Sequence, residues 1–311
     1  VGFAALADRV ILNTEKPDGV FVPSGRGSAI HTRAFVPVQN GCDHSCTFCI
    51  IPQGRGPSRS RPVADVVAEI GGLAEAGVAE VVLTGVDLTS YDRPSLGALV
   101  TAILRGVPTL PRLRLSSLDG IEIDPLLFEL LTQEPRVMPH VPLSLQSGDD
   151  MVLKRMKRRH SRGQAIELVE RLKTARPGIA IGADLIAGFP TETAEMHAAN
   201  LSIIAACDVV HGHVFPYSPR TGTPAAKMPQ IDGALRKERA AQLRAAGDVQ
   251  VVRHLNAMVG KQLEILVEQP GVGRTPHYAE MRFTGNAPTG GVVMAAATGL
   301  LEQKLTGTIA A

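Results

Sequence analysis

The sequence predicts an α/β protein, with a partial (β/α)6 barrel followed by a small β-barrel. Two observations predict this architecture. Between residues 32 and 215, six short apolar strand patterns alternate with amphipathic helical patterns, which is typical of a parallel sheet with helical crossovers. After Gly260 the pattern changes to short β segments separated by glycine and proline turns, which favours a small closed barrel.

The elements follow one another without long gaps. The strands of the first part are predicted at residues 32–39, 80–84, 112–116, 141–145, 179–186 and 209–215. Helices are predicted at residues 63–76, 96–104, 125–132, 150–156, 163–174 and 193–206. A longer charged helix at 235–257 leads to strands at 262–268, 278–283, 291–296 and 303–309. In parallel barrels the chemistry gathers at the carboxyl ends of the strands, so residues just after each strand are the first candidates for a site.

Composition and length indicate three segments and a soluble protein. The chain has 311 residues, 44% of them hydrophobic and 20% charged, with a formal net charge of +2. Residues 1–33 are too short to bury a core, residues 34–257 form the predicted barrel, and residues 258–311 form the small β-barrel. No apolar run approaches the roughly 20 residues that span a membrane. We therefore expect no membrane partner, and the low cysteine count favours a reducing cytoplasm.

Three of the four cysteines lie in the loop after the first predicted strand. Cys42, Cys46 and Cys49 have the spacing C-x3-C-x2-C. Three thiolates on one loop can hold three irons of a [4Fe-4S] cluster, and the fourth iron then keeps an open position. This spacing resembles that of radical S-adenosylmethionine (SAM) enzymes. Cys207 lies in an apolar helix end and is interpreted as a buried core thiol.

Two other readings of the cysteine loop remain open at this point. A structural zinc site normally has four protein ligands. No second Cys or His pair follows at a matching interval, and His44 is too close in sequence to Cys42 and Cys46 to be an obvious fourth ligand. A disulfide framework usually has an even number of cysteines in a short secreted chain, whereas this loop holds three cysteines in a chain of 311 residues.

Three strand ends offer groups for binding SAM. Gly85 lets the backbone approach a ligand closely, and the Asp87 carboxylate is a candidate partner for the ammonium of the methionine moiety. Ser117 and Gln146 end two further strands with hydroxyl and amide groups. The alternative for each of these residues is an ordinary turn or capping role.

Other candidate SAM contacts come from the loop and from two later segments. Phe48 lies between the last two cysteines and is a candidate for contact with the adenine. The guanidinium of Arg158 can clamp a carboxylate bidentately. Gly188 and Pro190 follow the fifth predicted strand, where backbone groups could cradle the adenine and ribose.

Basic residues predict a phosphate-binding rim beside the cysteine loop. Arg55, Arg59 and Arg61 follow the loop closely, and Arg159 lies in the dense basic run of residues 154–160. Such a rim binds nucleic-acid phosphates electrostatically. For Lys154 and Arg155 in the same run, a solvated helix face is an equally good interpretation.

With these residues assembled, the chain resembles the radical SAM methylthiotransferases. The resemblance runs from about residue 8 to the end and rests on several motifs. These are GCDHSCTFCIIP at 41–52, RGPSRSRP at 55–62, LTGVD at 83–87, PLSLQSG at 142–148, LKRMKRR at 153–159 and DLIAGFPTET at 184–193. The segment HVFPYSPRTGTPAAKMP at 213–229 is most similar to the branch acting on threonylcarbamoyladenosine in tRNA. Sister branches modify isopentenyladenosine in tRNA or an aspartate of a ribosomal protein.

The resemblance implies a radical SAM barrel, a carboxy-terminal TRAM-like barrel that grips RNA, and an amino-terminal domain of which residues 1–33 are a remnant. It also implies a reaction in which the cluster reductively cleaves SAM to a 5′-deoxyadenosyl radical. That radical abstracts hydrogen from carbon 2 of the adenine ring, and sulfur carrying a methyl group is delivered through a second cluster. The implied partners are the tRNA anticodon arm and an electron donor such as flavodoxin or ferredoxin, with the enzyme a cytoplasmic monomer.

Residues 1–33 depart from the family pattern. Full-length members carry three further cysteines in the amino-terminal domain, and residues 1–33 contain none. A second [4Fe-4S] cluster is therefore expected only in a full-length parent, and the chain by itself is expected to cleave SAM without completing turnover. Two rival classes are another radical SAM enzyme on a similar barrel and a non-catalytic RNA-binding protein with a structural metal.

Overall fold

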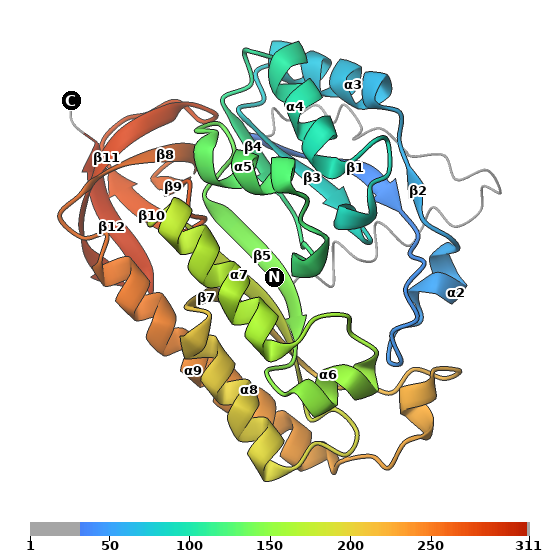
Figure 1. The fold of residues 1–311 in the computed structure, drawn as a ribbon. Coiled ribbons are helices and arrows are strands. Elements are labelled where there is room, and N and C mark those ends of the chain that lie inside the picture. The colour runs from blue at the N-terminus through green and yellow to red at the C-terminus, as the bar shows by residue number, and fades with distance from the viewer. Residues whose placement is uncertain (1–31, 310–311) are drawn as a thin grey trace.

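Six parallel strands form the wall of the first part of the fold (Figure 1). The structure is a computed structural model that describes residues 32–309, so the interpretation of residues 1–31 lies outside the described residues. One sheet holds β1 (Arg33–Asn40), β3 (Glu80–Gly85) and β4 (Arg112–Leu115), with the two-residue β2 (Arg59–Ser60) antiparallel at its edge. The other holds β5 (His140–Gln146), β6 (Ala180–Ala187) and β7 (Val209–Pro216). Single parallel bridges from Leu113 to Val137 and from Leu118 to Leu143 join the two sheets, which makes one curved partial barrel.

Helices connect these strands and cover the outer face of the sheet. They are α3 (Val63–Glu75), α4 (Leu96–Gly106), α5 (Pro125–Gln133), α6 (Asp150–Met156), α7 (Arg162–Ala175) and α8 (Ala194–Ala206). Short 3-10 turns follow the second and third parallel strands, at η1 (Leu88–Ser90) and η2 (Gly120–Glu122). Alternate residues of β1, β3, β4, β5 and β6 enter the main core with these helices; on β1 they are Ala34, Val36 and Val38. The residues between them face the concave side, where a site can form.

A closed five-stranded barrel forms the carboxy-terminal part. Its strands are β8 (Gln262–Gln269), β9 (Val272–Arg274), β10 (Glu280–Thr284), β11 (Val292–Leu301) and β12 (Lys304–Ile309). It has its own apolar core, which includes Ile265, Met281 and Leu305. The predicted fold class is confirmed: an α/β barrel of six parallel strands precedes a small β-barrel.

The long helix α9 (Gly233–Asn256) joins the two barrels and packs on β7 and α8. The small barrel lies against the amino ends of the parallel strands, where Arg112 at the start of β4 bonds to Glu264 and His140 at the start of β5 stacks on Tyr278 (Figure 1). The predicted division between 34–257 and 258–311 falls just after α9, and we propose it as the domain boundary.

Sequence patterns did not predict three short elements. They are the helix α2 (Ile51–Arg55), the strand β2 and the strand β9. Each has five residues or fewer, so a hydrophobic period cannot develop. The 3-10 turn η3 (Pro224–Lys227) is similarly short. Among the helices of residues 32–309, none has the length and apolar character needed to cross a membrane.

Candidate active site

The cysteine loop leaves the carboxyl end of β1 and is fixed at both ends of its course. The Cys42 amide donates to the Gly56 carbonyl at 3.1 Å, which ties the loop to the end of α2. Further along, the Thr47 amide donates to the Met156 carbonyl at 3.1 Å and its hydroxyl donates to the Arg155 carbonyl at 2.8 Å. The loop is therefore held between α2 and the carboxyl end of α6.

The three thiols of the loop suit a metal cluster. All four cysteines of the chain are free, and Cys42, Cys46 and Cys49 are half-buried. Burial, with a smaller contribution from Asp87, raises the pKa of Cys42 to about 12, and burial also raises the pKa of Cys49. A guanidinium nitrogen of Arg158 lies 3.8 Å from Cys46 Sγ. Because thiolates are the metal-binding form, cluster binding must release protons from these thiols, and the Arg158 cation favours the charged form.

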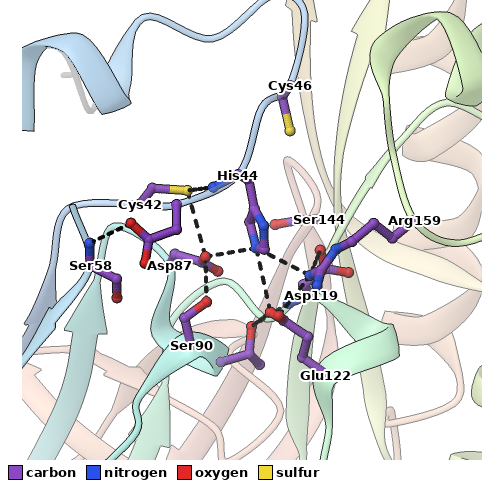
Figure 2. A network of polar contacts seen from close by, with 12 residues as sticks. Cys42, His44, Cys46, Ser58, Asp87, Ser90, Asp119, Glu122, Ser144 and Arg159 are labelled. Atoms are coloured by element: carbon purple, nitrogen blue, oxygen red, sulfur yellow. Dashed lines mark hydrogen bonds and ion pairs between the residues drawn. The ribbon is translucent and has the colours of Figure 1, made fainter. Parts of the chain in front are cut away.

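His44 points from the loop down to the strand ends (Figure 2). Its Nε2 lies 2.8 Å from Asp87 Oδ2 and 3.1 Å from a guanidinium nitrogen of Arg159. The Ser90 hydroxyl donates to the same Asp87 oxygen at 2.6 Å, and the Asp87 amide donates to Gln39 Oε1 at 2.8 Å. The predicted carboxylate therefore faces the site, 3.6 Å from Cys42 Sγ.

Arg158 lies under the other side of the loop. One of its guanidinium nitrogens is 2.9 Å from Asp119 Oδ2 and 3.0 Å from the Ser144 carbonyl, and its Nε is buried without a protein partner. Arg159 forms an ion pair with Glu122 at 2.7 Å. The two arginines thus place positive charge among carboxylates directly beside the thiols.

Ser117 faces the concave side of the sheet. Its hydroxyl donates to Asp184 Oδ2 at 2.8 Å, and His213 Nδ1 lies 3.1 Å from Asp184 Oδ1. The hydrogen bond to Asp184 raises the pKa of His213. Burial acts in the opposite direction, but its effect is smaller. Contact of Ser117 with SAM stays a prediction.

The glycines predicted at the site have packing roles. A Cβ on Gly85 would lie 2.9 Å from Gln39 Oε1 and 3.1 Å from Leu88 Cα, so the chain is closely packed there. Gly188 has φ +67°, and a Cβ there would lie 2.5 Å from Arg236 Cγ. Close packing therefore accounts for both glycines, and their contact with SAM stays a prediction.

Three further candidates lie at the edge of the site or beneath it. Pro190 is buried. The Phe48 ring packs edge-to-face on Phe189, with ring centroids 6.4 Å apart. Gln146 ends β5 with φ +64°. Their contacts with SAM also stay predictions.

The predicted phosphate-binding rim needs one correction. Arg61 is buried, and its guanidinium bonds to Glu69 at 2.7 Å and to the Pro37 carbonyl at 3.0 Å, so it does not belong to an exposed rim. Arg59 is exposed and donates to the Arg55 carbonyl at 3.2 Å. Arg159 is 44% exposed and engaged by Glu122, so it is shared between the site and the surface.

Sequence reasoning missed several polar residues of the site. Asp119, Glu122 and Asp184 were not singled out, and His44 and His213 were given no role. Asp119 and Glu122 follow the end of the strand predicted at residues 112–116, and this position alone marks them as candidate site residues. The pairing of Asp184 with His213 requires the register of β6 and β7, which no local pattern contains.

The curved sheet with a three-cysteine loop at the carboxyl end of its first strand defines a class of enzyme that holds a cluster in a partial barrel. The family model of the radical SAM superfamily matches residues 36–201, and the chain belongs to this superfamily. Its members use a [4Fe-4S] cluster and SAM. Cys42, Cys46 and Cys49 fit the cluster by their free thiols and by the Arg158 cation beside them.

Particular relatives are tRNA-modifying enzymes. The chain is 46% identical over 276 residues to the threonylcarbamoyladenosine tRNA methylthiotransferase MtaB of Rickettsia prowazekii, covering 87% of this chain and 66% of that protein. It is 38% identical over 298 residues to the tRNA-2-methylthio-N(6)-dimethylallyladenosine synthase of Anaeromyxobacter dehalogenans, covering 89% of this chain and 63% of that protein. The chain thus spans slightly less than two thirds of the length of these relatives.

A solved structure has the same fold. The radical SAM methyltransferase TsrM of Kitasatospora setae, with a tryptophan substrate and a SAM analogue bound, aligns with a TM-score of 0.52. The alignment covers 62% of this chain and 38% of that chain, at 23% sequence identity. This likeness supports the barrel architecture alone.

Proposed function

We propose that this chain carries the radical SAM and RNA-binding parts of a tRNA methylthiotransferase that acts on N6-threonylcarbamoyladenosine beside the anticodon. The observation that carries the proposal is the 46% identity to MtaB across 87% of the chain. The identity to the dimethylallyladenosine synthases is lower, at 35–40%. An enzyme for isopentenyladenosine in tRNA or for a ribosomal-protein aspartate is the second candidate.

The residues of this chain would act mainly by holding and orienting the reactants. Cys42, Cys46 and Cys49 would hold three irons, and the bound cluster and SAM would supply an electron and an adenosyl radical source. Asp87 would accept hydrogen bonds from the SAM ammonium, in place of the His44 and Ser90 contacts it makes in this structure. Arg158 would lie beside the thiolate of Cys46 and offer its unpartnered Nε to a carboxylate.

The carboxy-terminal barrel and three arginines would hold the RNA; Arg59 and Arg159 are exposed, and Arg55 is half-buried. Arg55, Arg59 and Arg159 lie beside the cysteine loop, where they would neutralise phosphates of the anticodon arm. We further propose a TRAM-like role for residues 258–311, a monomeric enzyme in the cytoplasm, and a flavodoxin or ferredoxin as electron donor. A second [4Fe-4S] cluster would belong to a full-length parent.

The test is complementation of a bacterial strain that lacks its own threonylcarbamoyladenosine methylthiotransferase. The gene of the full-length parent protein is expressed there, and tRNA nucleosides are analysed by mass spectrometry. The expected result is the 2-methylthio derivative of threonylcarbamoyladenosine, absent when Cys46 is replaced by Ala. Appearance of only methylthiolated isopentenyladenosine, or of a modified ribosomal protein, would reject the branch assignment.

A further inference from the structure

A second polar group lies on the concave face of the barrel, apart from the cysteine loop. It consists of Ser117 after β4, Asp184 on β6 and His213 on β7. The Asp184 carboxylate accepts a hydrogen bond from the Ser117 hydroxyl at 2.8 Å, and its other oxygen lies 3.1 Å from His213 Nδ1. Asp184 and His213 are not among the residues proposed to hold the cluster or SAM, whereas Ser117 is also a candidate SAM contact.

The chain geometry places this group just below the cysteine site. Leu118 pairs with β5, since its amide donates to the Pro142 carbonyl at 2.8 Å and its carbonyl accepts from the Ser144 amide at 2.9 Å. Leu118 enters the main core, so its neighbours Ser117 and Asp119 both face the concave side. Residues two apart on an extended chain lie roughly 6.6 Å from each other. Asp119 bonds to Arg158 beside the thiols, and Ser117 therefore lies one such step deeper.

An exposed aromatic ring lies on the same face. Asp184 pairs with His213, and Ile186 pairs with Phe215, so Phe215 and His213 share the concave side of β7. The Phe215 side chain is 53% exposed, although it lies on a strand. Within the described residues β7 is an edge strand, so solvent reaches this ring from the open side of the barrel.

We propose that Phe215 and Asp184 form the subsite for the purine nucleoside of the target RNA, with Ser117 and His213 as positioning residues that orient the Asp184 carboxylate. The inference rests on the proposed function and names the residues that would select its substrate. Bases of single-stranded RNA loops are splayed out and stack on aromatic rings, and a carboxylate accepts hydrogen bonds from N–H and O–H groups of a nucleoside. Both recognition groups are present here on one face.

The adenosine moiety of SAM has the same chemistry as the target nucleoside. The open edge favours the RNA, because a base attached to a polymer has to enter from the side of the barrel that faces solvent. Phe215 lies near the carboxyl end of β7 on that open edge, whereas the cysteine loop follows β1 toward the opposite side of the six-stranded wall.

The experiment measures RNA binding and SAM binding separately on anaerobically reconstituted protein. The RNA probe is an anticodon stem-loop with the fluorescent base 2-aminopurine at the target position, and SAM affinity is measured by equilibrium dialysis. Stacking of 2-aminopurine on the Phe215 ring is expected to lower the fluorescence of this base. Phe215→Ala is therefore expected to weaken RNA binding about tenfold and to abolish this loss of fluorescence. Asp184→Asn is expected to weaken RNA binding of a stem-loop carrying the natural nucleoside, and SAM affinity is expected to stay within about twofold in both variants.

Two controls separate recognition from folding. Phe215→Tyr keeps the ring and is expected to keep both RNA affinity and quenching. Val249→Ala removes an apolar side chain that is 65% exposed on α9 and is expected to change neither affinity.

Three results would each overturn the subsite. Unchanged RNA affinity in both Phe215→Ala and Asp184→Asn would reject it while leaving the proposed function intact. A loss of SAM affinity with unchanged RNA affinity would assign these residues to SAM. Failure of the wild-type protein to prefer the stem-loop over an unstructured RNA of equal length would reject the proposed function itself.

Discussion

At the scale of single residues, the Arg158 guanidinium lies between a thiol of the cysteine loop and a carboxylate at a strand end. It lies 3.8 Å from Cys46 Sγ and 2.9 Å from Asp119 Oδ2, and its side chain is almost wholly buried. A buried cation requires compensating negative charge. Asp119 supplies one such charge in this structure, and a cluster-bound thiolate would supply a second.

Cluster content tests the three loop cysteines. Replacing Cys42, Cys46 or Cys49 by Ala is expected to abolish the four-iron cluster, because each removes one thiolate ligand. The measurement is iron and acid-labile sulfide per chain after anaerobic reconstitution. Cys207→Ala is the matched control, since Cys207 is fully buried in the main core, where burial raises the pKa of its thiol to about 11. Loss of the cluster in this control would overturn the ligand assignment.

SAM affinity tests Arg158 and Asp87. Arg158→Ala is expected to weaken SAM binding by about 1.5–3 kcal/mol, the size of a hydrogen bond to a charged group, and Asp87→Asn is expected to weaken it as well. Binding isotherms with the reconstituted protein measure both. Lys154→Ala is the control, because Lys154 belongs to the same basic run but is exposed on α6. Equal SAM affinity in all three variants would return Arg158 and Asp87 to structural roles.

At the scale of elements, the entry to the cysteine loop is its most constrained point. Gly41 has φ +78°, and a Cβ there would lie 1.9 Å from the Pro57 carbonyl oxygen. Both the positive φ and the close backbone contact favour glycine. The neighbouring Cys42 amide donates to the Gly56 carbonyl, so any shift at Gly41 moves the first thiol directly.

Gly41→Ala is therefore expected to lower cluster occupancy severalfold and to lower the melting temperature of the protein. Gly54→Ala is a matched control in the same region, because nothing lies within 4 Å of a Cβ at Gly54 and it belongs to α2. The control is expected to leave cluster occupancy unchanged. Iron content and thermal unfolding distinguish the two variants, and equal behaviour would show that the loop tolerates a side chain at Gly41.

The helices and strands with a regular spacing of hydrophobic residues were predictable from sequence, and the contacts between them were not. The helix α6 was predicted with the observed limits of residues 150–156, and the buried Cys207 was placed in the core as observed. In contrast, Arg61 was placed on an exposed rim because it lies in a basic run. Its partner Glu69 lies eight residues further along the chain, on α3, and the ion pair between them depends on how β1 and α3 pack.

At the scale of the whole molecule, the two barrels meet through a buried polar interface. Arg112, which is 1% exposed, donates to Glu264 at 2.7 Å, and Arg33 reaches Glu268 at 2.9 Å. Glu80 lies beneath them: its burial would raise its pKa, but Arg114 and Arg33 outweigh that effect and lower the pKa to about 2. The charge in this interface is therefore fixed across the physiological range.

Four histidines surround Tyr278 in the same interface. His140 stacks on the Tyr278 ring at 5.1 Å, His211 packs against both rings, and His254 and His277 lie beyond. Burial lowers the pKa of His211 and of His277 to about 4, and nearby positive groups add to the effect. Arg33, Arg114 and Arg274 all lie over the Tyr278 ring, so an imidazolium here would meet like charge.

Acid is therefore expected to destabilise the protein already at pH values higher than those at which most carboxylates titrate. Between pH 6.5 and about 4 the unfolded chain binds protons at His211 and His277 that the folded chain does not bind, so the free energy of unfolding falls as pH falls through this window. Above about pH 7.5 these groups contribute almost no pH dependence, because the imidazoles are then neutral in both states. Urea unfolding of the iron-free protein at several pH values measures this slope.

His277→Gln is expected to reduce the acid-dependent loss of stability, because it removes one of the two groups with a pKa near 4. Val249→Ala, at an exposed position on α9 with no titratable group, is a comparison variant and is expected to keep the wild-type slope. An unchanged slope in His277→Gln would mean that the histidine cluster does not control the acid response.

The pairing of Arg112 with Glu264 has a consequence for building chimeric enzymes. The small barrel closes the amino end of the six-stranded wall, and removal of residues 260–311 would take away Glu264 and leave Arg112 with only the more distant Glu80 carboxylate at 3.9 Å. Exchanging this barrel between relatives would therefore succeed only when the acceptor wall and the incoming barrel keep matching charges at these positions. A chimera designed to change the substrate would therefore have to carry over both sides of the Arg112–Glu264 contact together with the small barrel.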